Sequence, residues 1–493
     1  MIARSCWDAR PSAPGRTCAP AVLLALLVLG GAAHASEPRP NIVLIVADDL
    51  GYGELGCYGG RDVPTPHIDS LAKDGVRFTS GYVTAPFCAA SRAALFTGRY
   101  QTRFGFEFNP IGAVNADPAV GLPASERTLA ERLREAGYAT ALVGKWHLGG
   151  TARFHPQRRG FDEFFGFLHE GHYYVPPPWD GHVTWLRRKA LPDGTLGRWT
   201  SPDGRTIWST HLGSFEPDYD ADNPLLRSSQ PVDEGANLTD AFTREAEAFI
   251  ARHKAQPFFL ELSYNCPHSP LQASDSYLAK FAHIPDIHRR IFAAMLAQLD
   301  DGVGRVLARL SAERLDDRTL IVFLSDNGGP TRELTSSNRP LRGEKGQLLE
   351  GGIRVPMLLR WTGHVPAGVE ESRMVSALDL GPTVFAAAGV TPPLDLDGVD
   401  LRPHLAARGT TPIRSRHYWR VGTQAALREG DWKIYRNRAG ETWQLYNLMA
   451  DPGEQNDLAA EEPGRAAALE AAWRSLDAEM TAPLWGGPAR GAR

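Results

Sequence analysis

The chain has 493 residues, of which 43% are hydrophobic and 22% are charged, a composition that is typical of globular proteins. Its formal net charge is −4 at pH 7, so the chain lacks the basic field that attracts nucleic acid or anionic lipid. We therefore expect no nucleic-acid partner. The length suits one large domain or two ordinary ones.

Residues 1–35 have the pattern of a signal peptide. A segment with three arginines precedes a short apolar run at residues 21–29, and Ala33-His34-Ala35 is a typical cleavage motif. The apolar run is short for a membrane-spanning helix, and an uncleaved anchor is the alternative. We expect an exported protein, periplasmic or extracellular, with no stable membrane span once the peptide is removed.

The first strand is predicted at residues 41–47, an uninterrupted apolar and β-branched run that suits a central parallel strand. Asp48 and Asp49 follow it, and the binding sites of open α/β sheets form at the carboxyl ends of the strands. A surface turn is the alternative. Two carboxylates directly after a buried strand favour a metal site.

A helix is predicted to begin near Cys88 and to end at Gly98. Cys88 would then lie in the first turn, where unpaired N–H groups favour negative charge, and Arg92 would share its face. This arrangement predicts a site that handles an anion. The alternative is a buried cysteine beside a solvated arginine.

Two further strands, predicted at residues 139–144 and 257–264, also lead into polar residues. Lys145 and His147 follow the first of them, and alternate residues of an extended chain point the same way, so both could reach one ligand. His268 follows the second strand. It is a candidate general acid, because histidine can release a proton near neutral pH, and a structural histidine is the alternative.

The strand predicted at residues 319–324 repeats the pattern of the first one. Asp326 and Asn327 follow it, and together with Asp48 and Asp49 they offer only carboxylate and amide oxygens. Hard oxygen ligands of this kind favour Ca²⁺ or Mg²⁺ over Zn²⁺.

Residues 161–235 carry little periodicity and many aromatic side chains. Long irregular segments are often binding loops, so we expect this insertion to select the substrate, with His172 among the candidate substrate ligands. Aromatic residues that only anchor the loops are the alternative.

The last part of the chain is predicted to form a smaller C-terminal α+β subdomain at residues 406–493, with short antiparallel strands and a helix at residues 465–476. The catalytic α/β domain would then occupy residues 36–405. Near its end, the glycine-rich segment at residues 340–356 carries Lys345, for which a solvated charge run is the alternative.

Three cysteines remain after removal of the signal peptide, which is no disulfide framework. Cys57 and Cys266 could pair once Cys88 is modified. Two small buried residues are the simpler interpretation.

The segment Cys88-Ala89-Ala90-Ser91-Arg92, followed by Ala94-x-x-Thr97-Gly98-Arg99, resembles the signature of the type I sulfatases, with Ala90 where that family usually has proline. The resemblance implies an α/β fold of the alkaline-phosphatase type, with a large, mixed and mostly parallel sheet flanked by helices and a smaller C-terminal subdomain built on an antiparallel sheet. It also implies that a maturation enzyme oxidises Cys88 to formylglycine (3-oxoalanine), whose hydrate is the nucleophile, and that the bound ion is Ca²⁺.

The same resemblance implies roles for the residues at the strand ends. Lys145 and Lys345 would bind the sulfate group, and His147 would contact the hydroxyl of the modified residue. Arg92 and the ion would stabilise the deprotonated hydrate at position 88, which also contacts the ion.

Together these motifs predict an enzyme that hydrolyses sulfate monoesters, with a sulfated carbohydrate or an aryl sulfate as substrate. A phosphomonoester, phosphonate or phosphodiester hydrolase on the same fold is one alternative. A catalytically silent glycan-binding homologue is another, because Ala90 departs from the family signature.

Overall fold

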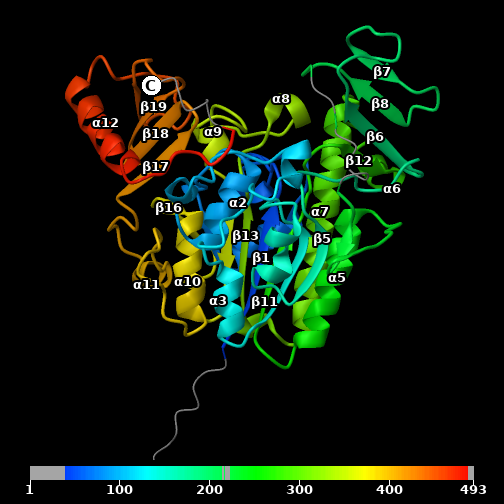
Figure 1. Ribbon diagram of the computed structural model, residues 1–493, viewed down its shortest axis with the longest axis horizontal. Coiled ribbons are helices and arrows are strands. Elements are labelled where there is room, and N and C mark those ends of the chain that lie inside the picture. The colour runs from blue at the N-terminus through cyan, green and yellow to red at the C-terminus, as the bar shows by residue number, and fades with distance from the viewer. Residues whose placement is uncertain (1–38, 214–215, 217–222, 487–493) are drawn as a thin grey trace, which may run out of the picture. The chain divides into compact units, whose positions relative to one another are not determined.

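A ten-stranded sheet forms the centre of the computed structural model, which describes residues 39–213, 216 and 223–486 (Figure 1). The predicted signal peptide lies outside the described residues. In spatial order the strands are β10 (Gln230–Pro231), β9 (Leu226–Arg227), β5 (Glu163–Phe167), β4 (Ala139–Lys145), β11 (Phe258–Ser263), β1 (Asn41–Ala47), β13 (Thr319–Ser325), β14 (Met357–Arg360), β2 (Val76–Phe78) and β15 (Val369–Glu371).

The five strands from β5 to β13 in this order are parallel, so their carboxyl ends meet at one edge of the sheet. Every residue of β1, β11 and β13 is buried. The alternation of the strand sends Val43 and Ile45 into one apolar cluster and Ile42 and Leu44 into another, which explains why β1 is apolar throughout.

Helices cover both faces of this sheet. One face packs against α1 (Pro66–Lys73), α5 (Leu238–His253) and α7 (Ile287–Ala312), and the other against α2 (Cys88–Thr97), α3 (Leu129–Glu135) and α10 (Leu380–Ala387). This is the predicted doubly covered α/β architecture. The shorter elements are β3 (Gly81–Tyr82), α6 (Asp275–Lys280), α8 (Thr331–Leu334), α9 (Glu350–Ile353), β16 (Val375–Ser376) and α11 (Arg402–Ala407).

A second sheet takes three of its four strands from the region that we expected to be irregular. Its order is β12 (Leu271–Ser274), β6 (His182–Arg187), β8 (Thr206–Ser209) and β7 (Arg198–Thr200), and we call it the insertion sheet. The expectation of loops was therefore wrong for much of residues 161–235, which also supply β5, β9 and β10 to the central sheet. The strands are short and separated by glycine and proline, so they leave little periodicity in the sequence.

The C-terminal sheet is antiparallel, as predicted. It consists of β17 (Arg416–Val421), β18 (Gln424–Glu429), β19 (Trp432–Arg436) and β20 (Gln444–Asn447), and α12 (Pro463–Asp477) packs against it. The described residues from 39 onward are held in a single compact unit, so the division at residue 405 stays a prediction. None of the described helices is both long enough and apolar enough to cross a membrane.

Candidate active site

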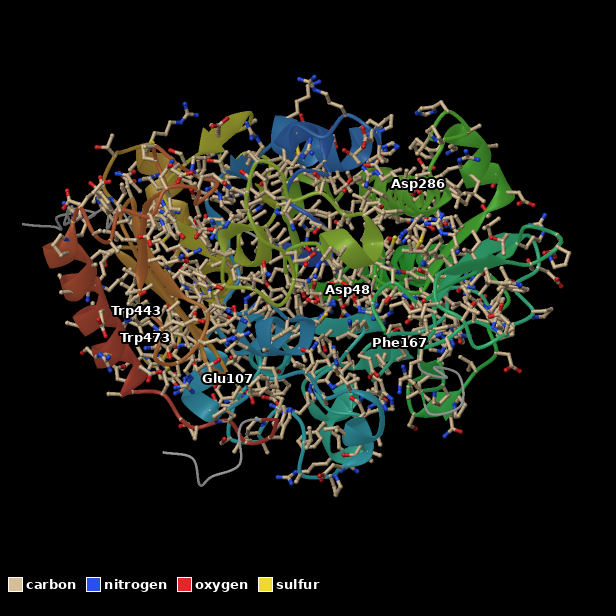
Figure 2. The ribbon with its side chains drawn as sticks, turned by 90° about the horizontal axis from the view of Figure 1, so that it is seen from above. Asp48, Glu107, Phe167, Asp286, Trp443 and Trp473 are labelled. Atoms are coloured by element: carbon tan, nitrogen blue, oxygen red, sulfur yellow. The ribbon has the colours of Figure 1, made fainter. Side chains whose placement is uncertain are left out.

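The carboxyl ends of the parallel strands bring together the acidic residues that the sequence indicated. Figure 2 shows one of them, Asp48, near the middle of the molecule seen from above. Asp48 and Asp49 follow β1, and Asp326 follows β13. The backbone ties these ends together, because the N–H of Asp326 donates to the carbonyl of Ala47 at 3.1 Å, and the N–H of Asp49 donates to the Asp326 carboxylate at 3.2 Å.

The three aspartates and Cys88 form one buried cluster. One ligand atom from each of the four residues lies within 4.8 Å of the others. The Nδ2 of Asn327 donates to Asp49 Oδ1 at 2.7 Å, while Asn327 Oδ1 and Asp48 Oδ1 are buried and have no hydrogen-bond partner among the described residues. Crowded carboxylates with unpartnered buried oxygens fit a divalent cation that prefers oxygen ligands.

The pKa values of the aspartates reflect this crowding. Burial disfavours ionisation of Asp49, but Lys345 and His268 beside it hold the pKa of Asp49 well below its usual range. Burial and the nearby Asp48 raise the pKa of Asp326, although Arg92 acts in the opposite direction. A bound cation would relieve the repulsion between these carboxylates.

Three basic side chains each pair with one of the aspartates. Lys145 Nζ is 2.6 Å from Asp48 Oδ2, and Lys345 Nζ is 2.8 Å from Asp49 Oδ2. The Nε and Nη2 of Arg92 are 2.9 Å and 2.8 Å from Asp326 Oδ2. The three positive and three negative charges balance, so a divalent cation would give the site a net positive charge suited to an anion.

The predicted helix begins at Cys88, as expected, and places this side chain beside the acidic cluster. Cys88 is buried, and its Sγ is 4.0 Å from Asp49 Oδ1. Burial and the nearby Asp48 raise the pKa of the Cys88 thiol well above its usual value, so an unmodified Cys88 is protonated and a poor nucleophile. The N–H of Ala89 donates to Asn109 Oδ1 at 2.9 Å, which fixes the start of α2.

The two predicted histidines present different nitrogen atoms to the site. The Nδ1 of His268 donates to the carbonyl of Ser269 at 2.6 Å, which leaves its Nε2 facing Asp49 Oδ2 at 3.6 Å. The Nε2 of His147 donates to the carbonyl of Pro110 at 2.9 Å, and its Nδ1 has no hydrogen-bond partner among the described residues. Burial lowers the pKa of both histidines, and Lys345 or Lys145 adds to this effect.

Backbone strain is concentrated at two of these residues. Asp49 and His147 adopt left-handed conformations, with φ of 67° and 59°. Residues other than glycine rarely do so, and such conformations are common where a functional side chain must be aimed.

Three residues that contact the site, Ser263, Asn109 and Pro110, belong to none of the predicted motifs. Ser263, at the end of β11, bridges Arg92 Nη1 and the carbonyl of Lys145, to which its Oγ donates at 2.7 Å. Its place at a strand end could have identified it. Asn109 and Pro110 lie in a loop without a motif, and only the folded chain brings them to Cys88 and His147.

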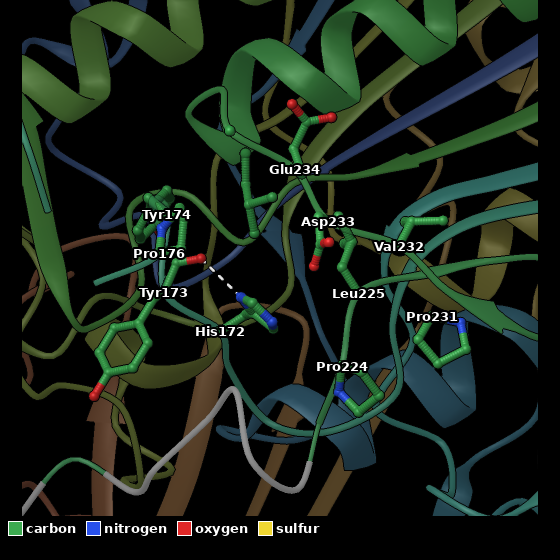
Figure 3. Close-up of a pocket in the computed structure, with 12 residues that line it drawn as sticks. His172, Tyr173, Tyr174, Pro176, Pro224, Leu225, Pro231, Val232, Asp233 and Glu234 are labelled. Carbon is green, nitrogen blue, oxygen red and sulfur yellow. Dashed lines mark hydrogen bonds between the residues drawn. The ribbon is translucent and has the colours of Figure 1, made fainter. Parts of the chain in front are cut away.

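His172 lies in a different pocket. Figure 3 shows it in the wall of a cavity of about 620 Å³, where its Nδ1 donates to the carbonyl of Tyr173 at 2.8 Å. None of the charged residues of the cluster lines that cavity. The role of His172 in substrate binding therefore stays a prediction.

The cluster opens to solvent on the side of Lys345. A shallow pocket of about 290 Å³ continues outward from this lysine. The residues that line it are Phe87, Leu212, Pro330, Arg332, Glu333, Glu344 and Lys345.

The other two described cysteines do not form a disulfide. Cys57 is a half-buried free thiol, and Cys266 is a buried free thiol, as expected.

Comparison with known proteins gives the same picture over most of the chain. A model of the sulfatase family matches residues 40–390, and a model described as N-sulphoglucosamine sulphohydrolase, C-terminal, matches residues 344–479. The loop that carries Lys345 lies within both matches.

Three similar proteins illustrate this match. N-acetylgalactosamine-6-sulfatase of Mus musculus is 34% identical over 453 residues, which cover 89% of this chain and 80% of that protein. Steryl-sulfatase of Mus musculus is 35% identical over 446 residues, which cover 80% of this chain and 69% of that protein. The crystal structure of Ps i-CgsB in complex with k-i-k-neocarrahexaose is 36% identical, has a TM-score of 0.80, and covers 92% of this chain and 95% of that one.

The matched family model spans well over half of the sequence, and its relatives share more than a third of their residues with it over most of their length. The chain therefore belongs to the sulfatase family, with the alkaline-phosphatase-like fold that its sequence predicted, and it is an enzyme that hydrolyses sulfate monoesters.

Proposed function

We propose that this sulfatase is exported, that it uses formylglycine derived from Cys88 as its nucleophile, and that its main substrate is a sulfated carbohydrate. The observation that carries the proposal is the ring of three bases, each paired with an aspartate, around the side chain of residue 88. The formylglycine hydrate supplies one hydroxyl for attack on sulfur and a second whose deprotonation releases the sulfate.

Asp48, Asp49, Asp326 and Asn327 are the residues that would hold the cation. The donor set contains only oxygens apart from residue 88, and two of those oxygens are buried without a partner, which favours Ca²⁺ and also suits Mg²⁺. When bound, the ion would neutralise charge on the sulfate oxygens and on the attacking hydroxyl.

The basic residues bind and polarise the sulfate group. Lys145 and Lys345 contact the aspartates on either side of residue 88, so their ammonium groups can neutralise sulfate oxygens as the sulfur is attacked. Arg92, four residues along the same helix, stabilises the deprotonated hydroxyl of residue 88.

The two histidines move protons at different steps. His268 donates a proton from Nε2 to the leaving alkoxide when it is in the imidazolium form, because Nδ1–H is engaged with Ser269 and Nε2 faces the cluster. Burial and Lys345 oppose this form, whereas the facing Asp49 carboxylate favours it. His147 accepts the proton of the second hydroxyl at Nδ1, the nitrogen that is free of hydrogen bonds among the described residues. This proton transfer breaks the bond to sulfate and restores the aldehyde.

A sulfated carbohydrate is supported by the relatives. One is named for a sulfated amino sugar, and one solved structure contains a neocarrahexaose. The steryl-sulfatase match leaves small hydrophobic sulfates as a competing substrate class. The signal-peptide pattern supports export, which would expose the enzyme to polymeric glycans outside the cell.

The first experiment is the mass of the tryptic peptide that contains Cys88, from protein made in its own host, together with rates on paired aryl sulfate and aryl phosphate. We expect formylglycine at position 88 and a faster rate on the sulfate. Cys88→Ala and Cys88→Ser should abolish turnover and keep the fold, because neither unmodified side chain has the second hydroxyl whose deprotonation releases sulfate. Substantial turnover by either variant would contradict the mechanism. An unmodified cysteine without sulfate release would favour a silent glycan-binding homologue, and a faster rate on the phosphate would favour a phosphoryl hydrolase.

A further inference from the structure

Lys345 lies on a loop that reaches the active site from the direction of the C-terminal sheet. Its Nζ pairs with Asp49, but the segment around it has no regular secondary structure, and Gly343 and Gly346 have φ values of 93° and 88°. The N–H of Lys345 makes only a long hydrogen bond of 3.4 Å, to the carbonyl of Gly329. Other contacts must therefore fix where the ammonium group sits.

Gln424, the first residue of β18, supplies such contacts directly after Lys345. Its Nε2 donates to the carbonyl of Gly346 at 2.8 Å, and its Oε1 accepts from the N–H of Leu348 at 3.2 Å. The side-chain amide of Gln424 thus uses both its NH2 group and its oxygen. If the amide were flipped, its NH2 group would face the N–H of Leu348 and its oxygen would face the carbonyl of Gly346, so only one orientation makes both hydrogen bonds.

The preceding peptide, which joins Lys345 to Gly346, is tied to the segment just before α2. The N–H of Gly346 donates to the carbonyl of Pro86 at 3.0 Å, two residues before Cys88. Gly346 is thus held between Gln424 and Pro86, and Lys345 is the residue immediately before it. A shift of Gln424 would be transmitted through Gly346 and the peptide that precedes it to the base of the lysine side chain.

A hydrogen bond and two ion pairs, farther from Lys345, anchor the two ends of this loop. Arg342 Nη1 donates to the carbonyl of Glu454 at 2.5 Å, and Lys433 Nζ lies 2.9 Å from Glu350 and 2.8 Å from Glu454. These contacts join residues 342 and 350 to the C-terminal region. Among the described residues of the C-terminal region, Gln424 is the one whose side chain hydrogen-bonds to residues 346–348.

We propose that Gln424 is a positioning residue that holds Lys345 in place to bind sulfate, so that the C-terminal sheet sets the affinity of the active site for its anion. The inference rests on the proposed role of Lys345 as a sulfate ligand. Because Lys345 would contact the sulfate before and during the reaction, its displacement should weaken binding more than it slows the chemical step.

The test measures inhibition by inorganic sulfate, together with KM and kcat for one sulfate ester, in the full-length matured enzyme. Gln424→Met keeps the length of the side chain and removes both hydrogen bonds. We expect the inhibition constant of sulfate and the KM to rise about three- to tenfold, with kcat changed less than about twofold. Gln444→Met is the matched control, because Gln444 lies in the same sheet and its side chain makes no hydrogen bond to the described residues of the loop.

A double-mutant comparison separates positioning from a merely structural role. Lys345→Met should weaken sulfate inhibition by itself, and Gln424→Met should then add no further loss, because the group that it positions is gone. The same loss from Gln424→Met with and without Lys345, or unchanged sulfate inhibition in Gln424→Met, would overturn the inference. Unchanged inhibition in Lys345→Met would also overturn it, and in addition would remove Lys345 from the proposed mechanism.

Discussion

The insertion sheet and the C-terminal sheet lie on either side of the strand ends that carry the candidate active site, and each supports a different side chain for which we propose a catalytic role (Figure 1). The insertion sheet reaches the site through Arg187, whose Nη1 is 2.9 Å from Glu333. That carboxylate accepts from Ser269 Oγ at 3.0 Å, and the Ser269 carbonyl holds His268. The C-terminal sheet reaches the site through Gln424 and Lys433.

The two supports differ in how deeply they are buried. The side chains of Arg187 and Glu333 are 18% and 20% exposed, whereas those of Lys433, Glu350 and Glu454 are fully buried. Water screens an exposed ion pair, so it adds little stability, but a buried pair leaves an uncompensated charge when one partner is removed. Loss of one partner should therefore cost more in the C-terminal support than loss of Glu333 from its pair with Arg187, which keeps its other partner, Glu216.

The largest effect expected from this difference is the loss of stability in Lys433→Met. This substitution leaves Glu350 and Glu454 buried without their shared ammonium group, and we expect the free energy of unfolding to fall by about 3–5 kcal/mol in urea denaturation. Glu333→Ala is the comparison variant, because Arg187 keeps its pair with the buried Glu216, and it should lose about 1 kcal/mol or less. Equal losses in the two variants would show that the supports do not differ in kind.

A smaller effect should appear in acid. Burial opposes the ionisation of Glu350, but Lys433, Arg354 and Arg428 hold its pKa well below the usual range. The unfolded chain therefore takes up this proton at a higher pH, and the stability that Glu350 adds is complete above the ordinary carboxyl pKa and is lost as the pH falls. Glu454 acts in the opposite direction, because burial raises its pKa.

Urea denaturation of the wild type and Glu350→Gln at pH 6 and pH 3 measures this contribution. Between the two pH values the wild type should lose about 1–2 kcal/mol more than the variant, whose amide cannot titrate. Parallel losses would mean that Glu350 is not the group whose charge stabilises the C-terminal support.

The residues at the strand ends could be predicted from the sequence because two simple rules apply to them. A strand buried on both faces is apolar throughout, and parallel strands end at the same edge, so Asp48, Asp49 and Asp326 had to lie close together. The start of α2 at Cys88 was predictable for a similar local reason, because the helix-forming run ends at a glycine.

The residues that support the site could not be predicted in the same way. Gln424 and Glu333 carry no motif, and each reaches the site only through contacts between segments far apart in the sequence. The insertion sheet was missed because its strands are short. In the fold, Trp199 and Trp208 are cross-strand neighbours with ring centroids 4.9 Å apart, whereas in the sequence they are aromatic residues in a stretch without alternation.

The smallest expected effect is a fall in kcat when the insertion sheet loses its contact with the site. It is measured by comparing two substrates whose leaving groups differ in their need for a proton. Glu333→Ala removes the acceptor of Ser269 Oγ and leaves Arg187 paired with Glu216, so the fold should keep its stability. The carbonyl that holds His268 then loses its support. We expect kcat to fall about tenfold on a sugar sulfate, whose alkoxide needs a proton, and about twofold or less on 4-nitrophenyl sulfate, whose leaving group does not.

Asp275→Asn is the control for this measurement, because Asp275 forms an exposed ion pair with Arg205 at the edge of the insertion sheet and has no contact with His268. An equal fall of kcat on both substrates would mean that Glu333 supports the site in general and does not act through the proton donor. Unchanged kcat on the sugar sulfate would mean that His268 keeps its orientation without the insertion. In that case Lys345 alone of the two side chains would depend on support from outside the central sheet, and the insertion would contribute to the pocket beyond Lys345 through Leu212.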